Sequence, residues 1–265
     1  MPVNQPRCRI SFAVAREAPY AVILREGPGK WTHLIGWDLR ADKFQFGQWL
    51  KAKIPNFDLS PNGELLLYFV QSYRQRRDFK TWVALSRPPW FSALALWGIG
   101  DSWGGGTQFI NASTIYIGKG LKEIKLNKGT LPKWLRWTSE QIPDENPGSS
   151  LGWKPIKEAK PIKRWEKSNG GKFRLRLDYA ENGKWIYFLV WGKGNKEETM
   201  KITSGAKVQV DWDPRGRIIF SAEGNLYAME RRSGNWTKTL LLDLNPMKPE
   251  TMAPPPDALK WPSRP

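Results

Sequence analysis

Short, almost continuously apolar runs alternate with polar turns along much of the chain. The clearest runs cover residues 65–70, 185–191 and 217–221, which is the usual length of a strand and too short for a typical buried helix. A strand that is apolar on both sides must be covered on both sides, as happens when sheets stack face to face. The pattern therefore predicts an all-β protein built from several small sheets.

One turn motif precedes all three runs. An aspartate opens it, a turn-forming residue follows three positions later, and a glycine comes two positions after that. The copies are Asp58-Leu-Ser-Pro-Asn-Gly63, Asp178-Tyr-Ala-Glu-Asn-Gly183 and Asp211-Trp-Asp-Pro-Arg-Gly216. Proline presets φ early in a tight turn, and glycine can adopt a positive φ at its end. The motif predicts a strand–turn–strand unit that recurs.

One complete four-stranded unit can be predicted near the C-terminal end of the chain. After the third motif, residues 223–230 supply a hairpin turn and a third strand, and residues 237–244 a fourth. Four short strands per period of roughly 40 residues are typical of β-propeller blades. We therefore predict one small propeller domain over residues 1–250, with four-stranded antiparallel blades at about 10–54, 55–98, 99–168, 169–205 and 206–250.

Five blades are expected, and a sixth could lie within the third unit. There, residues 119–172 are rich in Lys, Pro and Gly, and only short pieces such as residues 114–117 resemble strands. The proline-rich residues 251–265 are expected to form an extended tail on the surface or a linker.

The repeated Asp-x-x-Pro-x-Gly, followed by apolar residues and then by Gly224-Asn-Leu-Tyr227, resembles the blade signature of TolB-type and related WD40-like β-propellers. The resemblance covers residues 55–72, 176–192 and 207–232 and implies a propeller fold. Residues 86–107 also resemble a group of uncharacterised bacterial proteins, which implies a bacterial origin and no particular chemistry.

The net charge of the chain indicates which classes of partner to expect. The chain has 42 Lys and Arg against 25 Asp and Glu, a net charge of +17 and a pI near 10.0, so an acidic protein or a nucleic acid is the expected partner. One cysteine, Cys8, and one histidine, His33, exclude an internal disulfide and a Cys/His metal site, and a reducing compartment such as the cytoplasm suits the chain. We expect no cofactor and no membrane span.

The sequence contains no convincing set of catalytic residues. A Ser/His or Cys/His nucleophile would need His33, whose apolar neighbours favour a structural role. Asp58, Asp178 and Asp211 are the carboxylates that a glycoside-hydrolysing or glycan-binding propeller would use, but a residue repeated in the same turn usually serves the fold. The chain is therefore interpreted as a binding protein and not an enzyme.

Two stretches carry the candidate binding residues. The first gathers aromatic and charged groups around glycines, as partner-binding loops at blade ends do, although its tryptophans could equally pack between blades. Its members are Arg87, Trp90, Trp97, Asp101 and Trp103.

The second stretch, residues 119–167, interleaves lysines with tryptophans, which suits sequence-independent binding of a nucleic acid. Its candidate residues are Lys119, Lys122, Lys125, Lys128, Lys133, Trp134, Trp137, Lys154, Lys163 and Trp165. The first hypothesis is a non-catalytic interaction module that binds an acidic protein within a bacterial assembly. Nucleic-acid binding is the alternative.

Overall fold

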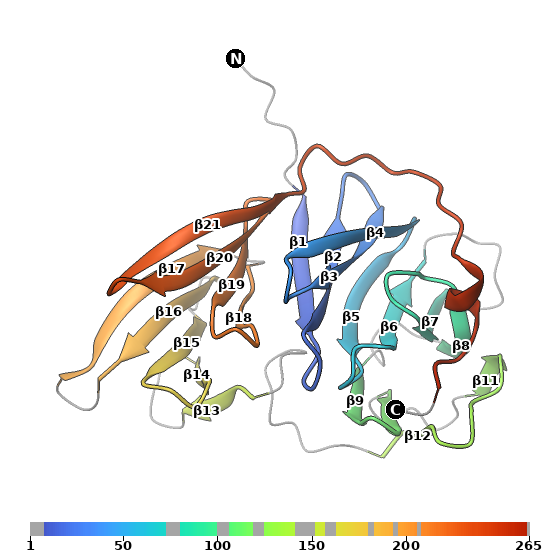
Figure 1. Cartoon of the computed structure of the whole chain (residues 1–265). Helices are drawn as coiled ribbons and strands as arrows, with labels where there is room; N and C mark the ends of the chain where they lie inside the picture. Colours follow the sequence, from blue (N-terminus) through green and yellow to red (C-terminus); the bar gives the residue numbers. More distant parts are fainter. Residues whose placement is uncertain are drawn as a thin grey trace. The chain divides into compact units, whose positions relative to one another are not determined.

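The computed structural model describes residues 8–72, 80–99, 106–118, 125–140, 152–156, 163–179, 183–192, 196–205 and 208–263. In these ranges the chain is all-β, with the short 3-10 helix of Pro256–Leu259 near its C-terminal end, and forms five small sheets. Figure 1 shows the sheets in the colours of the sequence. The predicted fold class is confirmed: five small sheets, mostly antiparallel and of three to five strands, are consistent with a small β-propeller.

The chain divides into two compact units. Unit 1 comprises Met1–Cys8, Phe12–Pro143 and Pro246–Pro265, and unit 2 comprises Arg9–Ser11 and Asp144–Asn245. The predicted single domain over residues 1–250 stays a prediction.

The first sheet has the order β1-β2-β3-β4 and the second the order β5-β6-β7-β8-β11, while the third, β12-β10-β9, contains a parallel pair, β10 with β12. The strands are β1 (Arg9–Val14), β2 (Tyr20–Glu26), β3 (Thr32–Asp38), β4 (Lys43–Leu50), β5 (Lys53–Leu59), β6 (Leu66–Gln71), β7 (Thr81–Ser86), β8 (Ala93–Ile99), β9 (Thr107–Asn111), β10 (Thr114–Ile117), β11 (Lys125–Lys128) and β12 (Arg136–Thr138).

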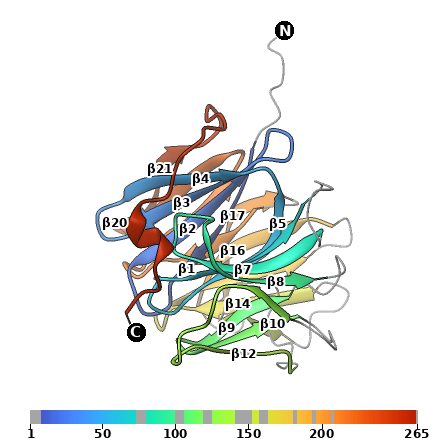
Figure 2. The same cartoon turned by 90° about the vertical axis from the view of Figure 1, so that its right-hand side faces the viewer.

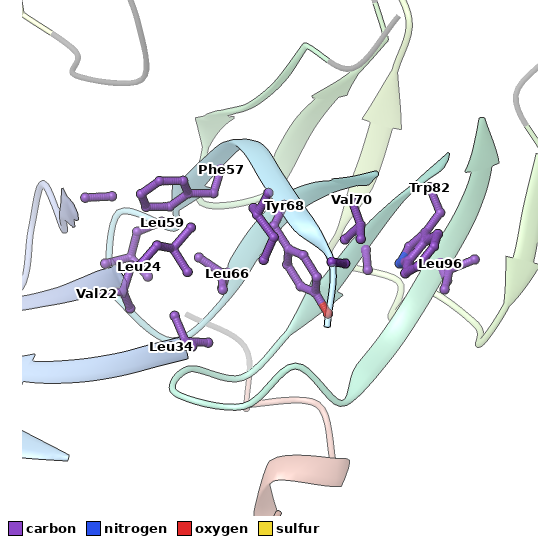
Figure 3. Packing of buried hydrophobic residues seen from close by; sticks show 14 of the residues in the cluster. Val22, Leu24, Leu34, Phe57, Leu59, Leu66, Tyr68, Val70, Trp82 and Leu96 are labelled. Atoms are coloured by element: carbon purple, nitrogen blue, oxygen red, sulfur yellow. The ribbon is translucent and has the colours of Figure 1, made fainter. Parts of the chain in front are cut away.

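The first two sheets pack face to face through the apolar strands that the sequence predicted. Val22, Leu24 and Leu34 of the first sheet meet Leu59 and Leu66 of the second in one buried cluster (Figure 3). The other face of the second sheet packs against the third sheet, whose strands lie beside β7 and β8 in Figure 2. Both faces of β6 and β7 are therefore covered, which explains their continuous hydrophobicity.

Unit 2 contains the last two sheets, with the orders β13-β14-β15-β16-β17 and β18-β19-β20-β21. The strands are β13 (Lys154–Ile156), β14 (Lys163–Ser168), β15 (Phe173–Tyr179), β16 (Trp185–Trp191), β17 (Glu198–Gly205), β18 (Val210–Trp212), β19 (Ile218–Ala222), β20 (Asn225–Arg232) and β21 (Asn235–Asp243). The last unit predicted, residues 206–250, contains the four strands of the last sheet.

The boundary predicted between the third and fourth units needs correction. We expected the fourth unit to begin at residue 169, but β13 and β14 pair within the fourth sheet, and β14 pairs with β15 along Lys163–Ser168. The reason is the position of Asp178. The motifs of Asp58 and Asp211 lie on the first strand of their sheets, whereas Asp178 lies on β15, the third strand of its sheet. Counting from the motif therefore placed the start of this sheet too late.

The two proline-containing turns have the predicted geometry. The amide of Gly63 donates to the carbonyl oxygen of Ser60 over 2.9 Å, and the amide of Gly216 donates to that of Asp213 over 3.0 Å. Both glycines have a positive φ, 79° and 76°. A left-handed backbone at this position favours glycine, which explains why the motif ends as it does.

Residues 246–263 follow β21 and belong to unit 1. They contribute no strand to the described sheets and contain only the 3-10 helix η2 (Pro256–Leu259). In Figure 1 this segment runs past β4 and then beside β8. The tail predicted for residues 251–265 is held on unit 1, as far as it is described, by hydrogen bonds to its backbone and by packing of Trp261.

Candidate functional site

The loop between β7 and β8 carries the first two predicted partner-binding residues, Arg87 and Trp90, and is fastened to its surroundings. Gln48 of β4 binds this loop through two hydrogen bonds. Its backbone amide donates to the carbonyl oxygen of Pro89 over 3.1 Å, and its side-chain oxygen accepts from the backbone amide of Phe91 over 2.8 Å. Trp90 is 8% exposed. The half-buried Arg87 donates to the carbonyl oxygen of Asp257 in the C-terminal segment over 3.4 Å.

Trp97, the third predicted residue, must be removed from the candidate set. Its side chain is fully buried between the second and third sheets, and its ring contacts that of Trp137 at 6.4 Å. Here the alternative interpretation, packing between sheets, is correct. Asp101 and Trp103 lie outside the described residues. The predicted set therefore forms no exposed surface in the described part of the chain.

The predicted nucleic-acid residues fall in both units. In unit 1, Lys133 is exposed, while the rings of Trp134 and Trp137 pack on the core of the second and third sheets. In unit 2, Lys154 and Lys163 are exposed. Of the other predicted lysines, Lys119 and Lys122 lie outside the described residues. Lys125 and Lys128 lie on β11, but their side chains are not described.

The tryptophan of unit 2 in this set lies in an aromatic group. Trp165 of β14 is half-buried and contacts Trp185 at 5.8 Å between ring centroids, and Trp185 contacts Tyr179 at 4.7 Å. Lys163 lies two residues before Trp165 on the same strand. This arrangement places a positive charge near partly exposed rings.

The three repeated aspartates are buried and engaged in structural contacts. The two side-chain oxygens of Asp58 accept hydrogen bonds from the amides of Leu59 (2.9 Å) and Phe109 (2.7 Å), so this carboxylate ties β5 to β9. Burial raises the pKa of Asp58 to about 6. Asp211 accepts from the amide of Trp212 over 2.7 Å and pairs with Lys167 at 2.6 Å.

Asp178 differs from the other two aspartates. Both of its side-chain oxygens accept from the guanidinium of Arg164 on the neighbouring strand, over 2.7 and 2.9 Å. Arg176 and Glu197 extend this pair into a network, with a separation of 3.1 Å between their charged atoms. A carboxylate bound in this bidentate way is held by the sheet.

His33 is buried between β3 and β4. Its Nε2 lies 3.1 Å from the carbonyl oxygen of Gly47, and its ring stacks on Trp49 at 4.2 Å. Burial lowers the pKa of His33 to about 4, so the imidazole is neutral at physiological pH. Its surroundings are those of a packed aromatic side chain.

Sequence reasoning missed a surface of unit 2 that we name the Phe173 surface, formed by Lys172, Phe173, Trp191, Arg231 and Trp236. Trp236 and Trp191 pack on the Phe173 ring at 5.2 and 6.2 Å. The cationic groups of Lys172 and Arg231 lie 5.3 and 5.4 Å from the same ring. The three aromatic residues are half-buried, and both cations are exposed.

The local pattern of β15 was one signal for this surface, because alternation places Phe173, Leu175 and Leu177 on one face of the strand. The contribution of the β20–β21 hairpin depends on packing of Arg231 and Trp236, 58 and 63 positions further along the chain, on Phe173, and no local pattern encodes it.

The described residues contain no group of three or more His, Cys, Asp or Glu side chains that could hold a metal ion. Within the same ranges, no helix has the length and hydrophobicity needed to cross a membrane.

No model of a known protein family matches the chain, and no curated protein does. Several solved structures resemble it distantly. The WD40 domain of SCAP from fission yeast has 11% identity and a TM-score of 0.26, over 90% of this chain and 46% of that one. An uncharacterized protein from Listeria monocytogenes has 11% identity and a TM-score of 0.32, over 89% and 84% of the two chains.

An acylaminoacyl peptidase from Pyrococcus horikoshii has 12% identity and a TM-score of 0.29, over 90% of this chain and 45% of that one. The chain thus spans less than half the length of the first and third structures. Likenesses this low carry no argument about activity. The repeated antiparallel sheets themselves are consistent with the WD40-like propeller fold that the sequence predicted.

Proposed function

We propose that this chain is a non-catalytic β-propeller interaction module of a bacterial protein assembly, and that it binds an acidic protein partner. The Phe173 surface is the binding site in this proposal. The cytoplasm is the proposed compartment, because a chain with one buried cysteine needs no oxidising environment.

The observation that carries the proposal is the pair of cations on Phe173. Lys172 and Arg231 both lie against the ring, and neither has a carboxylate partner among the described residues. Arginines elsewhere in unit 2, such as Arg174 and Arg176, are paired with Glu197. The Phe173 surface thus combines unneutralised positive charge with aromatic anchors, the composition of a binding hot spot for an acidic partner.

Its position also suits a binding role. Lys172 and Phe173 follow the turn between β14 and β15, and Arg231 and Trp236 flank the turn between β20 and β21. Loops at the ends of sheets commonly carry function on a rigid scaffold.

The structural engagement of the repeated aspartates supports a non-catalytic role. A glycoside-hydrolysing site needs carboxylates that face the substrate. Asp58 binds two backbone amides, Asp178 binds Arg164 and Asp211 binds Lys167. Replacing each with Asn should lower the free energy of unfolding, and a panel of glycosides should show no turnover by the wild type.

Nucleic-acid binding remains the second candidate, and the group of Trp165, Trp185 and Tyr179 favours it. These rings are half-buried and lie near the exposed Lys163. Base stacking on partly exposed aromatic rings, together with phosphate contacts from lysine, is how proteins bind single strands without sequence preference.

Capture of partners from the source organism distinguishes the two candidates. The full chain would be immobilised and exposed to lysate with and without nuclease, at a series of salt concentrations. We expect an acidic protein to remain bound after nuclease treatment and to resist moderate salt, because desolvated aromatic anchors contribute to its affinity. Loss of all captured material on nuclease treatment, with log affinity falling linearly with log salt, would instead identify a nucleic-acid ligand.

A further inference from the structure

The C-terminal segment, residues 246–263, is bound to unit 1 as a peptide ligand would be. Three side chains donate hydrogen bonds to its backbone carbonyl oxygens: Arg25 to Met247 (3.0 Å), Gln48 to Met252 (3.1 Å) and Arg87 to Asp257 (3.4 Å). The three carbonyls are spaced five residues apart. None of these donors binds a side chain of the segment, so recognition here depends on its backbone, which is non-helical at Met247 and Met252 and forms the 3-10 helix η2 at Asp257.

The hydrogen bond from Arg25 to Met247 is part of the buried interior of unit 1. Arg25 of β2 is only 2% exposed, and its guanidinium also donates to the carbonyl oxygen of Gly27 and lies 5.2 Å from the ring centroid of Trp49. Burying a charged group is costly unless its donors are satisfied. The carbonyl oxygen of Met247 is one of the acceptors that satisfy them, so the segment helps to complete a buried polar site.

The far end of the segment adds side-chain anchors. Ala258 is 2% exposed, and Pro262 is also buried. The ring of Trp261 packs edge-on against Trp134 at 6.5 Å and contacts the core of the second and third sheets. This end of the surface therefore accepts a small side chain and, three residues later, a Trp-Pro pair.

We propose that this surface of unit 1 is a peptide-binding site for a proline-rich segment of a partner protein, and that residues 246–263 are its built-in competitor. We name it the peptide site, with Arg25, Gln48, Arg87 and Trp134 as its contact residues. The partner segment presents backbone carbonyls to Arg25, Gln48 and Arg87 and an aromatic-proline anchor to Trp134.

The segment can be replaced because it is not part of any described sheet, so its departure breaks no β-ladder. Tethering gives it a high effective concentration at the site, of millimolar order for a short flexible linker. A free peptide therefore binds the intact chain weakly, and weakening the built-in segment uncovers the site.

The test uses the full chain and a fluorescent synthetic peptide of residues 246–263. The double variant Ala258→Arg/Trp261→Ala replaces one buried anchor with a bulky charge and truncates the other, which releases the built-in segment. We expect this variant to bind the peptide at least about tenfold more tightly than the wild type does. Leu259→Ala, at an exposed position in the same segment, is the matched control and should bind as weakly as the wild type.

A second set of variants tests the site itself. Adding Arg87→Ala to the double variant should weaken peptide binding several-fold, because one donor is lost, whereas adding Arg40→Ala, at an exposed position of unit 1, should not. Circular dichroism and thermal unfolding establish that each variant is folded. If the double variant does not fold, Trp261→Ala alone takes its place.

Three results would overturn the proposal. The first is a folded, released variant that does not bind the peptide, and the second is binding that a scrambled peptide of the same composition reproduces. The third is exchange of the segment between two wild-type chains, seen as a concentration-dependent dimer, which would assign the site to a second copy instead of a partner protein.

Discussion

At the scale of single residues, the proline-containing turns show how local chemistry determines backbone geometry. Asp58 and Asp211 use one side-chain oxygen in the same way, to accept from the amide of the next residue. Their second contacts differ: Asp58 binds the amide of Phe109 on β9, whereas Asp211 binds Lys167 on β14. The shared bond belongs to the motif, and the second bond depends on what packs alongside.

The buried Asp58 should make the stability of the fold depend on pH. Its pKa in the folded chain, about 6, exceeds the ordinary value of 3.8. The folded state therefore binds this proton more tightly than the unfolded chain does, so the stabilising contribution is complete below about pH 4 and is lost as the pH rises through 6. A shift of this size corresponds to roughly 3 kcal/mol.

Asp58→Asn tests this expectation. An amide cannot titrate, and its NH2 group cannot accept from the amide of Phe109, so the variant should be less stable than the wild type by about 1–3 kcal/mol at pH 4 and by less at pH 7, where the wild type has lost the contribution of the protonated Asp58. The measurement is the free energy of unfolding in denaturant at several pH values from 4 to 7. The difference between wild type and variant should change across this interval, and a constant difference would show that Asp58 does not titrate there.

The sequence predicted this residue-scale chemistry well where it is local. Pro61 with Gly63, and Pro214 with Gly216, specified their turns without help from the rest of the chain. The bond from Asp58 to Phe109 spans 51 residues and could not be read from either strand. Trp97 shows the same limit: its burial depends on the third sheet, which contributes Phe109 and Ile115.

At the scale of elements, continuously apolar strands were easy to predict and short polar strands were not. β16 covers Trp185–Trp191 as expected, and β10 covers Thr114–Ile117. β11 and β13 are four and three residues long, each begins with a lysine, and both lie at sheet edges. Edge strands are covered on fewer sides and often carry charge, so they lack the hydrophobic signal that marks a strand in sequence.

The contact between β4 and the β7–β8 loop depends on the absence of a side chain at Gly47. A Cβ atom there would overlap the carbonyl oxygen of Pro89 and lie 2.8 Å from that of Leu34. Gly47→Ala should therefore push the loop away from β4 and destabilise the fold by about 1–3 kcal/mol. Thermal unfolding measures the effect.

Gly106→Ala is the matched control for this prediction. A Cβ at that position comes no nearer than 3.7 Å to its neighbours, which is ordinary van der Waals contact. The control variant should unfold near the wild-type temperature. Equal unfolding temperatures for all three proteins would show that the loop does not pack on Gly47 as described.

At the scale of the whole molecule, repeat counting predicted an all-β chain of five small sheets, whereas the candidate sites were predicted less well. Charge and tryptophan content indicated a binding protein, but they could not place the binding residues. Trp90 and Trp97 are buried, and the Phe173 surface combines residues from two sheets that sequence spacing keeps apart. A surface made by packing becomes visible only when the packing is known.

The most direct test of the proposed function is a charge reversal on the Phe173 surface. The double variant Lys172→Glu/Arg231→Glu would be compared with the wild type in capturing the acidic partner, and Lys43→Glu/Arg40→Glu, at exposed positions of unit 1, would serve as the control of equal charge. We predict at least a tenfold loss of affinity for the first variant only, because like charges then face the partner at the aromatic anchors. An equal loss in both variants, or none in either, with both proteins folded, would contradict the binding role assigned to the Phe173 surface.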